Sequence, residues 1–163
     1  MMPLTRRDSA HRRPLYTAEE RVRRDSTRWT FVQGVLAPVQ FLVFAVSLVL
    51  VLRYLATGAG YEVATLSVIV KTMFLYIIMI TGAIWEKVVF GQYLLAPAFF
   101  WEDVFSFAVI ALHTAYLVAL WADFLSPTGL MTLALMAYTT YVINAGQFIL
   151  KLRMARLDMA AQP

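Results

Sequence analysis

Long apolar runs separated by short polar breaks dominate this chain. Four runs reach the roughly 20 residues that a helix needs to cross a bilayer, and they cover residues 31–55, 63–85, 101–125 and 130–152. Nowhere do apolar and polar side chains alternate over about ten residues, as they do in membrane strands. The pattern therefore predicts four membrane-spanning α-helices.

The breaks between the runs indicate the topology. Residues 56–60 (ATGAG) and 126–129 (SPTG) are short turn sequences that contain glycine or proline. Such short connections force the two helices that they join to lie antiparallel. We therefore expect an all-α integral membrane protein, folded as a four-helix transmembrane bundle.

The polar segment before the first run carries one local signal. Thr17-Ala18-Glu19-Glu20 fits a capping box, which predicts a short helix at the membrane surface over residues 18–28. Residues 1–15 carry no pattern, and we expect them to be disordered. The chain then divides into a basic cytoplasmic N-terminal arm with this short helix, a four-span membrane domain and a C-terminal tail, at residues 1–28, 29–157 and 158–163.

Composition agrees with a membrane protein. Hydrophobic residues make up 61% of the 163 residues, and the mean hydropathy is +0.68, whereas soluble domains hold about 45–50% apolar residues. The chain has no cysteine, which excludes disulfides, thiolate catalysis, iron–sulfur clusters and cysteine-based zinc sites. Its two histidines, His11 and His113, are too few for a multi-histidine metal site, and we expect no bound cofactor.

The net charge of +4 is unevenly distributed. Eight arginines precede Trp29: Arg6, Arg7, Arg12, Arg13, Arg21, Arg23, Arg24 and Arg28. A basic arm of this kind can bind nucleic acid. Beside a membrane span, however, it marks the cytoplasmic side and meets anionic lipid. Lys87 in the second loop and the basic tail lie on the same side, so we expect both termini in the cytoplasm, the lipid bilayer as a partner and no nucleic acid.

Charged side chains gather at the ends of the second and third runs. Glu86, Lys87, Glu102 and Asp103 border the loop between them. A charge at the edge of lipid is costly to desolvate, so it is either exposed to water or kept for a task. The same stretch is rich in aromatic residues, namely Trp85, Phe90, Tyr93, Phe99, Phe100, Trp101 and Phe105. The combination suits a large, flat, apolar ligand that needs acid–base chemistry at one point.

The third run also carries a histidine on the face of its acids. Glu102 and His113 are eleven residues apart, which places them on one face about 16 Å apart. His113 can be a hydrogen-bond partner for another helix, a proton relay or an axial ligand to a metal-centred macrocycle. Glu102 or Asp103 can also simply favour the positive end of the helix dipole, although two adjacent acids and Glu86 exceed what capping needs.

The other runs carry polar residues at helical spacing. Gln33, Gln40 and Ser47 recur every seven residues, which predicts one stripe of interhelical hydrogen bonds. Lys71 lies within the second run, where it either snorkels to the outer surface or serves a function. On the fourth run one face carries Thr140, Asn144 and Gln147, with Tyr141 nearby and Lys151 one turn beyond. Most of these polar side chains fall in the cytoplasmic half, which suggests a site reached from the cytoplasmic leaflet.

Several long strings resemble one known family, the 3-vinyl (bacterio)chlorophyllide hydratases of bacteriochlorophyll biosynthesis. The resemblance covers about residues 16–157. It rests on YTAEERVRRDSTRW before the first run, VQGVLAPVQFLVF within it, and TGAIWEKVVFG, APAFFWEDVFS, ALHTAYL and YVINAGQFILKLR further along.

The resemblance implies a reaction, a substrate and a location. The enzyme would be a hydro-lyase that adds water to the vinyl group of a magnesium chlorin, giving a 1-hydroxyethyl group without a redox cofactor. It would lie in the bacterial inner, or intracytoplasmic, membrane. A bundle of only four helices is too narrow to enclose a chlorin well, which favours a homo-oligomer or a larger biosynthetic complex. The choice between chlorophyllide and bacteriochlorophyllide stays open.

The chemistry of this reaction indicates roles for the acids. Protonation of the terminal vinyl carbon leaves a cation that the macrocycle delocalises, and water then attacks the carbon beside the ring. We expect one of Glu86, Glu102 and Asp103 to donate the proton and another to orient the water. His113 then relays protons or binds the substrate magnesium. The residues expected to contact the substrate are Gln33, Tyr93, Trp101, Tyr141, Asn144 and Gln147.

Two other functions compete with this one. The first is a pigment-binding or assembly protein that holds the chlorin through His113 without altering it. The second is a small four-span multidrug exporter. Such exporters depend on a carboxylate deep in the first span, and this chain has none between residues 31 and 52.

Overall fold

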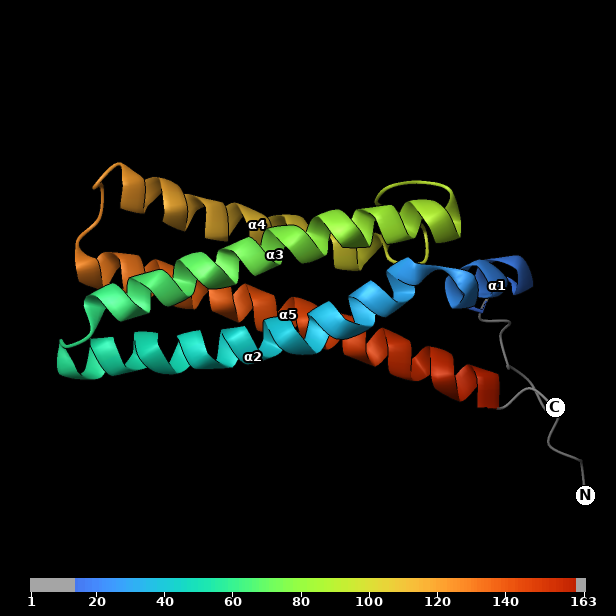
Figure 1. The fold of residues 1–163 in the computed structure, drawn as a ribbon, viewed down its shortest axis with the longest axis horizontal. Coiled ribbons are helices and arrows are strands. Elements are labelled where there is room, and N and C mark those ends of the chain that lie inside the picture. Colours follow the sequence, from blue (N-terminus) through green and yellow to red (C-terminus); the bar gives the residue numbers. More distant parts are fainter. Residues whose placement is uncertain (1–13, 161–163) are drawn as a thin grey trace, which may run out of the picture.

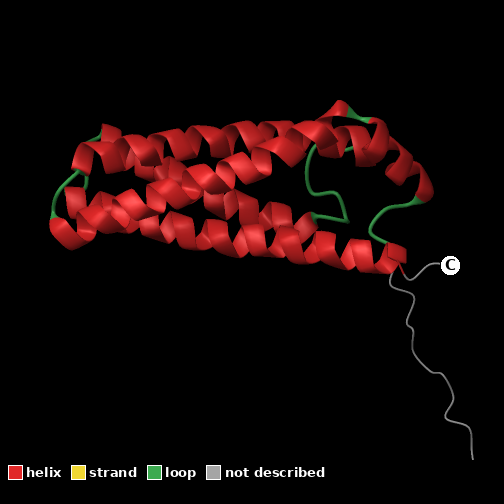
Figure 2. Cartoon of the chain, turned by 60° about the horizontal axis from the view of Figure 1, so that its bottom comes forward, coloured by secondary structure: helices red, strands yellow, loops and turns green. Residues whose placement is uncertain are grey.

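The computed structural model describes residues 14–160. Within this range the chain forms five helices, and it contains no strand (Figure 2). The helices are α1 (Ala18–Ser26), α2 (Arg28–Thr57), α3 (Tyr61–Phe90), α4 (Phe100–Trp121) and α5 (Pro127–Ala160). The predictions of disorder over residues 1–15 and of a C-terminal tail over residues 158–163 lie mostly outside the described residues. Of these residues the structure describes 14–15, and it includes 158–160 in α5.

The prediction of four spans is confirmed. Helices α2 to α5 are each long and apolar enough to cross a bilayer, and they lie side by side along the longest axis of the molecule (Figure 1). Three of them extend beyond the predicted apolar runs, because backbone hydrogen bonding continues into the polar flanks. Helix α4 instead ends at Trp121, four residues before the predicted end. There Asp123 adopts a φ of +50° and the Phe124 amide turns back to the Ala119 carbonyl.

Two tight turns make the bundle a pair of antiparallel hairpins, as expected. Gly58 and Gly60 join α2 to α3 with φ values of +70° and +85°. Side chains with a Cβ rarely adopt this left-handed region, so glycine suits both positions. The turn that joins α4 to α5 lies at residues 122–126 rather than at the predicted residues 126–129, because Pro127, Thr128 and Gly129 already form the first turn of α5.

Helix α1 confirms the predicted capping box. The Glu20 amide donates to Thr17 Oγ1 at 3.2 Å, and the Thr17 amide donates to Glu20 Oε2 at 2.8 Å. The helix ends at Ser26 rather than at the predicted Arg28, because Thr27 is extended and begins a new helix. Its hydroxyl accepts from the Trp29 amide at 3.3 Å and so caps α2.

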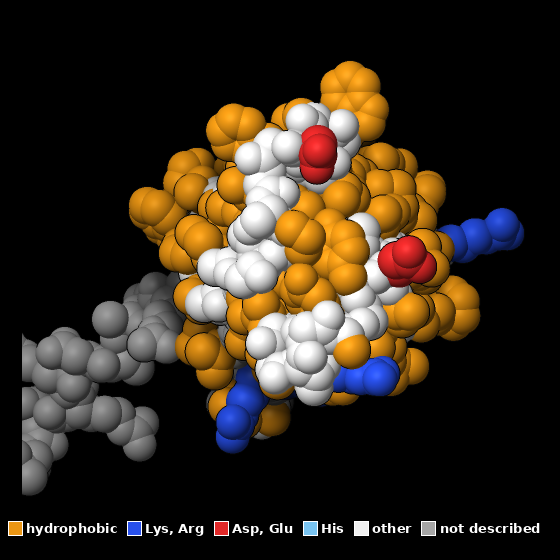
Figure 3. Space-filling model, turned by 90° about the vertical axis from the view of Figure 1, so that its left-hand side faces the viewer, with side chains coloured by type: hydrophobic (Ala, Val, Ile, Leu, Met, Phe, Trp, Pro, Cys, Tyr) orange, Lys and Arg blue, Asp and Glu red, His pale blue; other side chains and the backbone are white. Residues whose placement is uncertain are grey.

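The two ends of the bundle differ in charge. One end, here called the α1 end, holds α1, the loop over residues 91–99 and the last turns of α5 (Figure 1). Its basic residues are Arg21, Arg23, Arg24, Arg28, Lys87, Lys151, Arg153 and Arg156. The opposite end holds the two tight turns, and Arg53 lies near it. Figure 3 looks at that opposite end and shows mostly apolar side chains with few charged ones.

Interhelical hydrogen bonds follow the predicted polar stripe of α2. Gln33 Nε2 donates to Thr81 Oγ1 of α3 at 2.7 Å. The Ser47 hydroxyl bonds both Ser67 of α3, at 2.7 Å, and the Tyr138 hydroxyl of α5. Gln40 is buried between them. The stripe therefore faces the other helices, as the seven-residue spacing predicted.

Candidate active site

The loop between α3 and α4 brings two carboxylates together. Gly91 caps the end of α3, which finishes at Phe90. The chain then folds back so that two consecutive amides of the loop point at acidic side chains. The Leu95 amide donates to Asp103 Oδ2 at 2.7 Å, and the Ala96 amide lies 3.3 Å from Glu86 Oε2. Leu95 reaches this position with a φ of +60°, an unusual value for a residue with a side chain.

The Glu86 and Asp103 carboxyl groups lie close together, because the amides of the adjacent residues Ala96 and Leu95 reach one carboxyl group each. We call these two carboxyl groups the acidic pair. They come from different helices, and their residues are only 5% and 3% exposed. The pair is thus sheltered from bulk water and fixed by the backbone of the loop.

Glu102 lies beside the acidic pair with a different partner. Lys151 of α5 donates to Glu102 Oε2 at 2.7 Å. Asn144 ties the same turn of α4 to α5, because its amide donates to the Glu102 carbonyl at 2.8 Å. The Ser106 hydroxyl completes the connection by donating to Asn144 Oδ1 at 3.1 Å. Gln147 lies next to Asn144, with its Oε1 at 3.5 Å from Nδ2.

The lysine that pairs with an acid at this site is Lys151, and not Lys87, which lies among the acids in the sequence. Lys87 Nζ donates to the Gly91 carbonyl at 2.7 Å and closes the end of its own helix. Lys151 takes the expected place from the end of α5. The available signal was its position one turn beyond Gln147, on the polar face of the fourth run.

Aromatic side chains beside the acids pack mainly against one another. Tyr16 stacks on Phe90 at a centroid distance of 5.8 Å, and Phe99 stacks on Phe148 at 5.8 Å. Trp85 meets Phe99 edge-on at 5.7 Å. Burial raises the pKa of the Tyr16 phenol, although the Arg24 guanidinium near it opposes that shift. This cluster closes the α1 end over the acids instead of offering open ring faces.

Two other aromatic residues of the same stretch stay exposed. Tyr93 is 60% exposed and Trp101 is 65% exposed. Lys87 lies 5.4 Å from the Tyr93 ring, and Phe100 meets Trp101 edge-on at 5.4 Å. These rings have free faces near the loop, so they are the ones that can meet a flat ligand.

His113 lies apart from the acids. It is fully buried, and ten residues of helix α4 separate it from Asp103, a rise of about 15 Å. Its Nδ1 lies 2.8 Å from the Val109 carbonyl, which can only accept, so Nδ1 carries the proton. Its ring lies 5.8 Å from that of Tyr138. The expected role of His113 in proton relay or magnesium binding stays a prediction.

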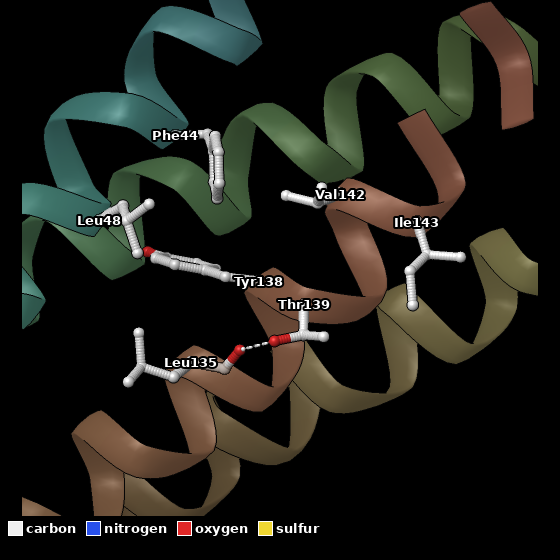
Figure 4. A pocket seen from close by; sticks show the side chains of 7 residues that line it. All are labelled: Phe44, Leu48, Leu135, Tyr138, Thr139, Val142 and Ile143. Atoms are coloured by element: carbon white, nitrogen blue, oxygen red, sulfur yellow. Dashed lines mark hydrogen bonds between the residues drawn. The ribbon is translucent and has the colours of Figure 1, made fainter. Parts of the chain in front are cut away.

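An apolar groove of about 350 Å³ lies between α2 and α5 (Figure 4). Its lining is Phe44, Leu48, Leu135, Tyr138, Thr139, Val142 and Ile143, with no acidic or basic residue. Residues 14–160 also contain no group of three or more His, Asp or Glu side chains that could hold a metal ion. The groove therefore offers apolar surface and no acidic or basic side chain.

Comparison with known proteins identifies the family. A family model described as 2-vinyl bacteriochlorophyllide hydratase matches residues 16–154. The chain belongs to this family. A curated 2-vinyl bacteriochlorophyllide hydratase of Cereibacter sphaeroides is 74% identical over 152 residues, which is 93% of both chains. The protein of the same name in Rhodobacter capsulatus is 68% identical over 152 residues, which is 93% of this chain and 88% of that one.

Membership of this family confirms the resemblance that the sequence strings indicated. It also confirms the expected class of enzyme, because a hydratase is a lyase. These names number the vinyl group 2, whereas the resemblance numbered it 3. No solved structure matches this chain. The arrangement of the acidic pair in this family is therefore read from the present structure.

Proposed function

We propose that this chain adds water to the vinyl group of a bacteriochlorophyllide, and that the acidic pair carries out the reaction. The observation that supports this assignment is that adjacent loop amides hold two buried carboxyl groups, one from α3 and one from α4, close together. Hydration of an alkene needs one acid and one base near the same two carbons. Two adjoining carboxyl groups supply both when they hold one proton between them.

Glu86 is the better proton donor of the two. A carboxylate that accepts a strong backbone hydrogen bond is stabilised in its charged form. Asp103 accepts such a bond from Leu95 at 2.7 Å, whereas the contact of Glu86 with Ala96 is longer, at 3.3 Å. Two negative charges in contact also repel each other strongly away from water. In our proposal the shared proton therefore rests on Glu86 and the charge on Asp103.

The reaction then balances within the pair. Glu86 gives its proton to the terminal vinyl carbon, and the carbon beside the ring becomes a cation that the macrocycle delocalises. The Asp103 carboxylate stabilises this cation and holds a water molecule. The water oxygen bonds to the cationic carbon and releases one proton, which restores the acidic pair. The net change is the addition of one water, without an oxidant or reductant.

Glu102 has a supporting role in this proposal. Its carboxylate is engaged by the Lys151 ammonium at 2.7 Å, so we do not assign it the proton transfer. Lys151 also offsets the negative charge beside Asp103. Among the residues predicted to contact the substrate, Tyr93 and Trp101 offer free ring faces, whereas Gln33 and Asn144 bond protein partners.

The orientation in the membrane follows from charge. Because basic residues concentrate at the α1 end, we place that end and both termini in the cytoplasm, in the inner membrane of the bacterium. A pigment with a broad aromatic ring partitions to the bilayer interface. The loop over residues 91–99 would meet it there from the cytoplasmic leaflet.

The direct test is turnover by the purified protein. In detergent with the vinyl pigment and oxygen-labelled water, we expect the absorption to shift to the blue as conjugation is lost. The labelled oxygen should appear in the product, which mass spectrometry detects. A protein that only holds the pigment would bind it without consuming the vinyl group, and that result would reject the proposal in favour of the pigment-binding alternative.

A further inference from the structure

Lys71 is buried within α3, about a third of the way along the helix from Tyr61. Its exposure is 0%, and its Nζ makes no hydrogen bond to any residue between 14 and 160. The ammonium lies 3.8 Å from the centre of the Tyr141 ring. The prediction that it could snorkel to the outer surface is therefore wrong, because the side chain points into the bundle.

No anion balances this cation within the described residues. The ion pairs found there join Arg24 to Asp25 and Lys151 to Glu102, which leaves Lys71 without a carboxylate. Two further buried atoms, Gln40 Oε1 and His113 Nε2, also lack a hydrogen-bond partner in this part of the chain. We call Gln40, Lys71, His113 and Tyr141 the mid-bundle cluster. The face of Tyr141 compensates part of the charge, but it is a weaker partner than an anion.

The substrate class supplies the missing charge. A chlorophyllide is the free acid of its pigment, so it carries a propionate carboxylate on one edge of an otherwise apolar ring. We propose that Lys71 binds this carboxylate, an inference that rests on the proposed function. An intramembrane lysine that stays unpaired in the free protein then has a partner in the complex.

In this proposal one tetrapyrrole with its propionate arm reaches from the acidic pair toward Lys71. Tyr141, which lies under the Lys71 ammonium, is seven residues from Phe148 on α5, a rise of about 10 Å. Phe148 stacks on Phe99, which begins the turn that holds Asp103. Along α3, Lys71 and Glu86 are fifteen residues apart, a rise of about 22 Å, so the ring must be joined by its propionate arm and by an extended Lys71 side chain to bridge them. The flexible four-carbon stem of Lys71 lets the ammonium leave Tyr141 and follow the carboxylate.

Comparing the free acid of the substrate with its methyl ester tests this assignment. For the wild-type protein we expect kcat/KM to favour the acid by about ten- to hundredfold, the range for one charge-assisted hydrogen bond. The difference should lie mostly in KM, because the carboxylate is remote from the reacting carbons. Lys71→Met should raise KM for the acid until acid and ester react alike. Lys71→Arg, which keeps the charge, should retain the preference.

The matched control is Arg53→Met, which removes an exposed cation near the opposite end of the bundle and should keep the wild-type ratio. Lys71→Met replaces an unpaired ammonium with an apolar chain of similar length, so we expect thermal unfolding in detergent at or above the wild-type temperature. A wild-type protein that treats acid and ester equally would overturn the assignment, as would a Lys71→Met variant with the wild-type ratio.

A binding measurement keeps this test separate from the proposed function. Titration of both pigment forms, followed by absorption, gives their Kd values without turnover. A wild-type protein that hydrates neither form refutes the proposed function alone. The ratio of the two Kd values in wild type and in Lys71→Met then still supports or refutes the role of Lys71.

Discussion

The acidic site and the mid-bundle cluster are both buried and polar, yet they differ in how well their groups are satisfied. At the α1 end, Asp103 accepts from a loop amide and Glu102 pairs with Lys151. In the middle of the bundle, Lys71 Nζ, His113 Nε2 and Gln40 Oε1 have no partner within residues 14–160. The first arrangement is complete in the free protein, whereas the second lacks an anion.

The cause of this difference lies in the backbone. A loop leaves amide groups free, and the amides of Leu95 and Ala96 are directed at carboxylates. Within a helix each amide already donates to the preceding turn, so a side chain there must find a side-chain or ligand partner. Preorganised groups suit the chemical step, because they need no rearrangement when charge develops. Unsatisfied groups suit binding, because the ligand completes them.

The largest effect should come from breaking the acidic pair. Glu86→Gln removes the proton donor and Asp103→Asn removes the negative charge beside it, each while keeping the shape of the side chain, so kcat should fall by about a hundredfold or more. In Asp103→Asn the oxygen of the side-chain amide can still accept the hydrogen bond from the Leu95 backbone amide, so the loop should keep its conformation. The double variant should lose little more than the poorer single variant, because the two groups act as one unit. Steady-state kinetics of the three variants measures this.

The control for the acidic pair is Glu62→Gln, which neutralises an exposed carboxylate in the first turn of the same helix α3. Its rate should match that of the wild-type protein. Wild-type rates in both single variants of the pair would remove the carboxylates from the mechanism. Losses that multiply in the double variant would show that Glu86 and Asp103 act independently.

A smaller effect should follow from breaking the Lys151–Glu102 ion pair. Removing one partner of a fully buried pair costs about 3–5 kcal/mol. Because the Lys151 side chain is 23% exposed, we expect Lys151→Met to lower the free energy of unfolding by only about 1–3 kcal/mol. Adding Glu102→Gln to this variant should recover part of the loss, since no charge is then left unpaired. Thermal unfolding in detergent of the wild type, both single variants and the double variant measures this coupling.

Lys87→Met is the matched control for that cycle. Lys87 caps its own helix through an exposed bond to the Gly91 carbonyl, so its loss should cost less and should not couple to Glu102. Equal effects of Lys87→Met and Lys151→Met would mean that the ion pair contributes no more than an exposed cap.

The elements that sequence predicts well here are those governed by local pattern. Apolar run length predicts the four spans, turn residues predict the two hairpins, and Thr17 with Glu20 predicts the cap of α1. The seven-residue spacing of Gln33, Gln40 and Ser47 also predicts that their common face points into the bundle. Each of these features depends on residues close together in the chain.

The features that sequence missed depend on contacts between distant segments. The residues around Lys151 carry no signal that α5 passes beside Glu102. Lys87 lies nearer to Glu102 in the sequence, but it bonds the Gly91 carbonyl instead. The left-handed conformation of Leu95 has no residue signal such as glycine, yet it directs the amide at Asp103. The sequence likewise placed Lys71 within the second span without showing that Tyr141 lies opposite.

The smallest effect should come from Ser47, which joins three helices without touching a charged group. Ser47→Ala removes its contacts with Ser67 and Tyr138, and buried hydrogen bonds in membrane proteins average about 0.6 kcal/mol each. We expect the free energy of unfolding in detergent to fall by about 1 kcal/mol, with wild-type kcat. Ser67→Ala should cost less, because its hydroxyl loses one partner from another helix rather than two. A lower kcat in Ser47→Ala, at unchanged stability, would instead mean that contacts inside the bundle influence the chemical step, and that the acidic pair does not act alone.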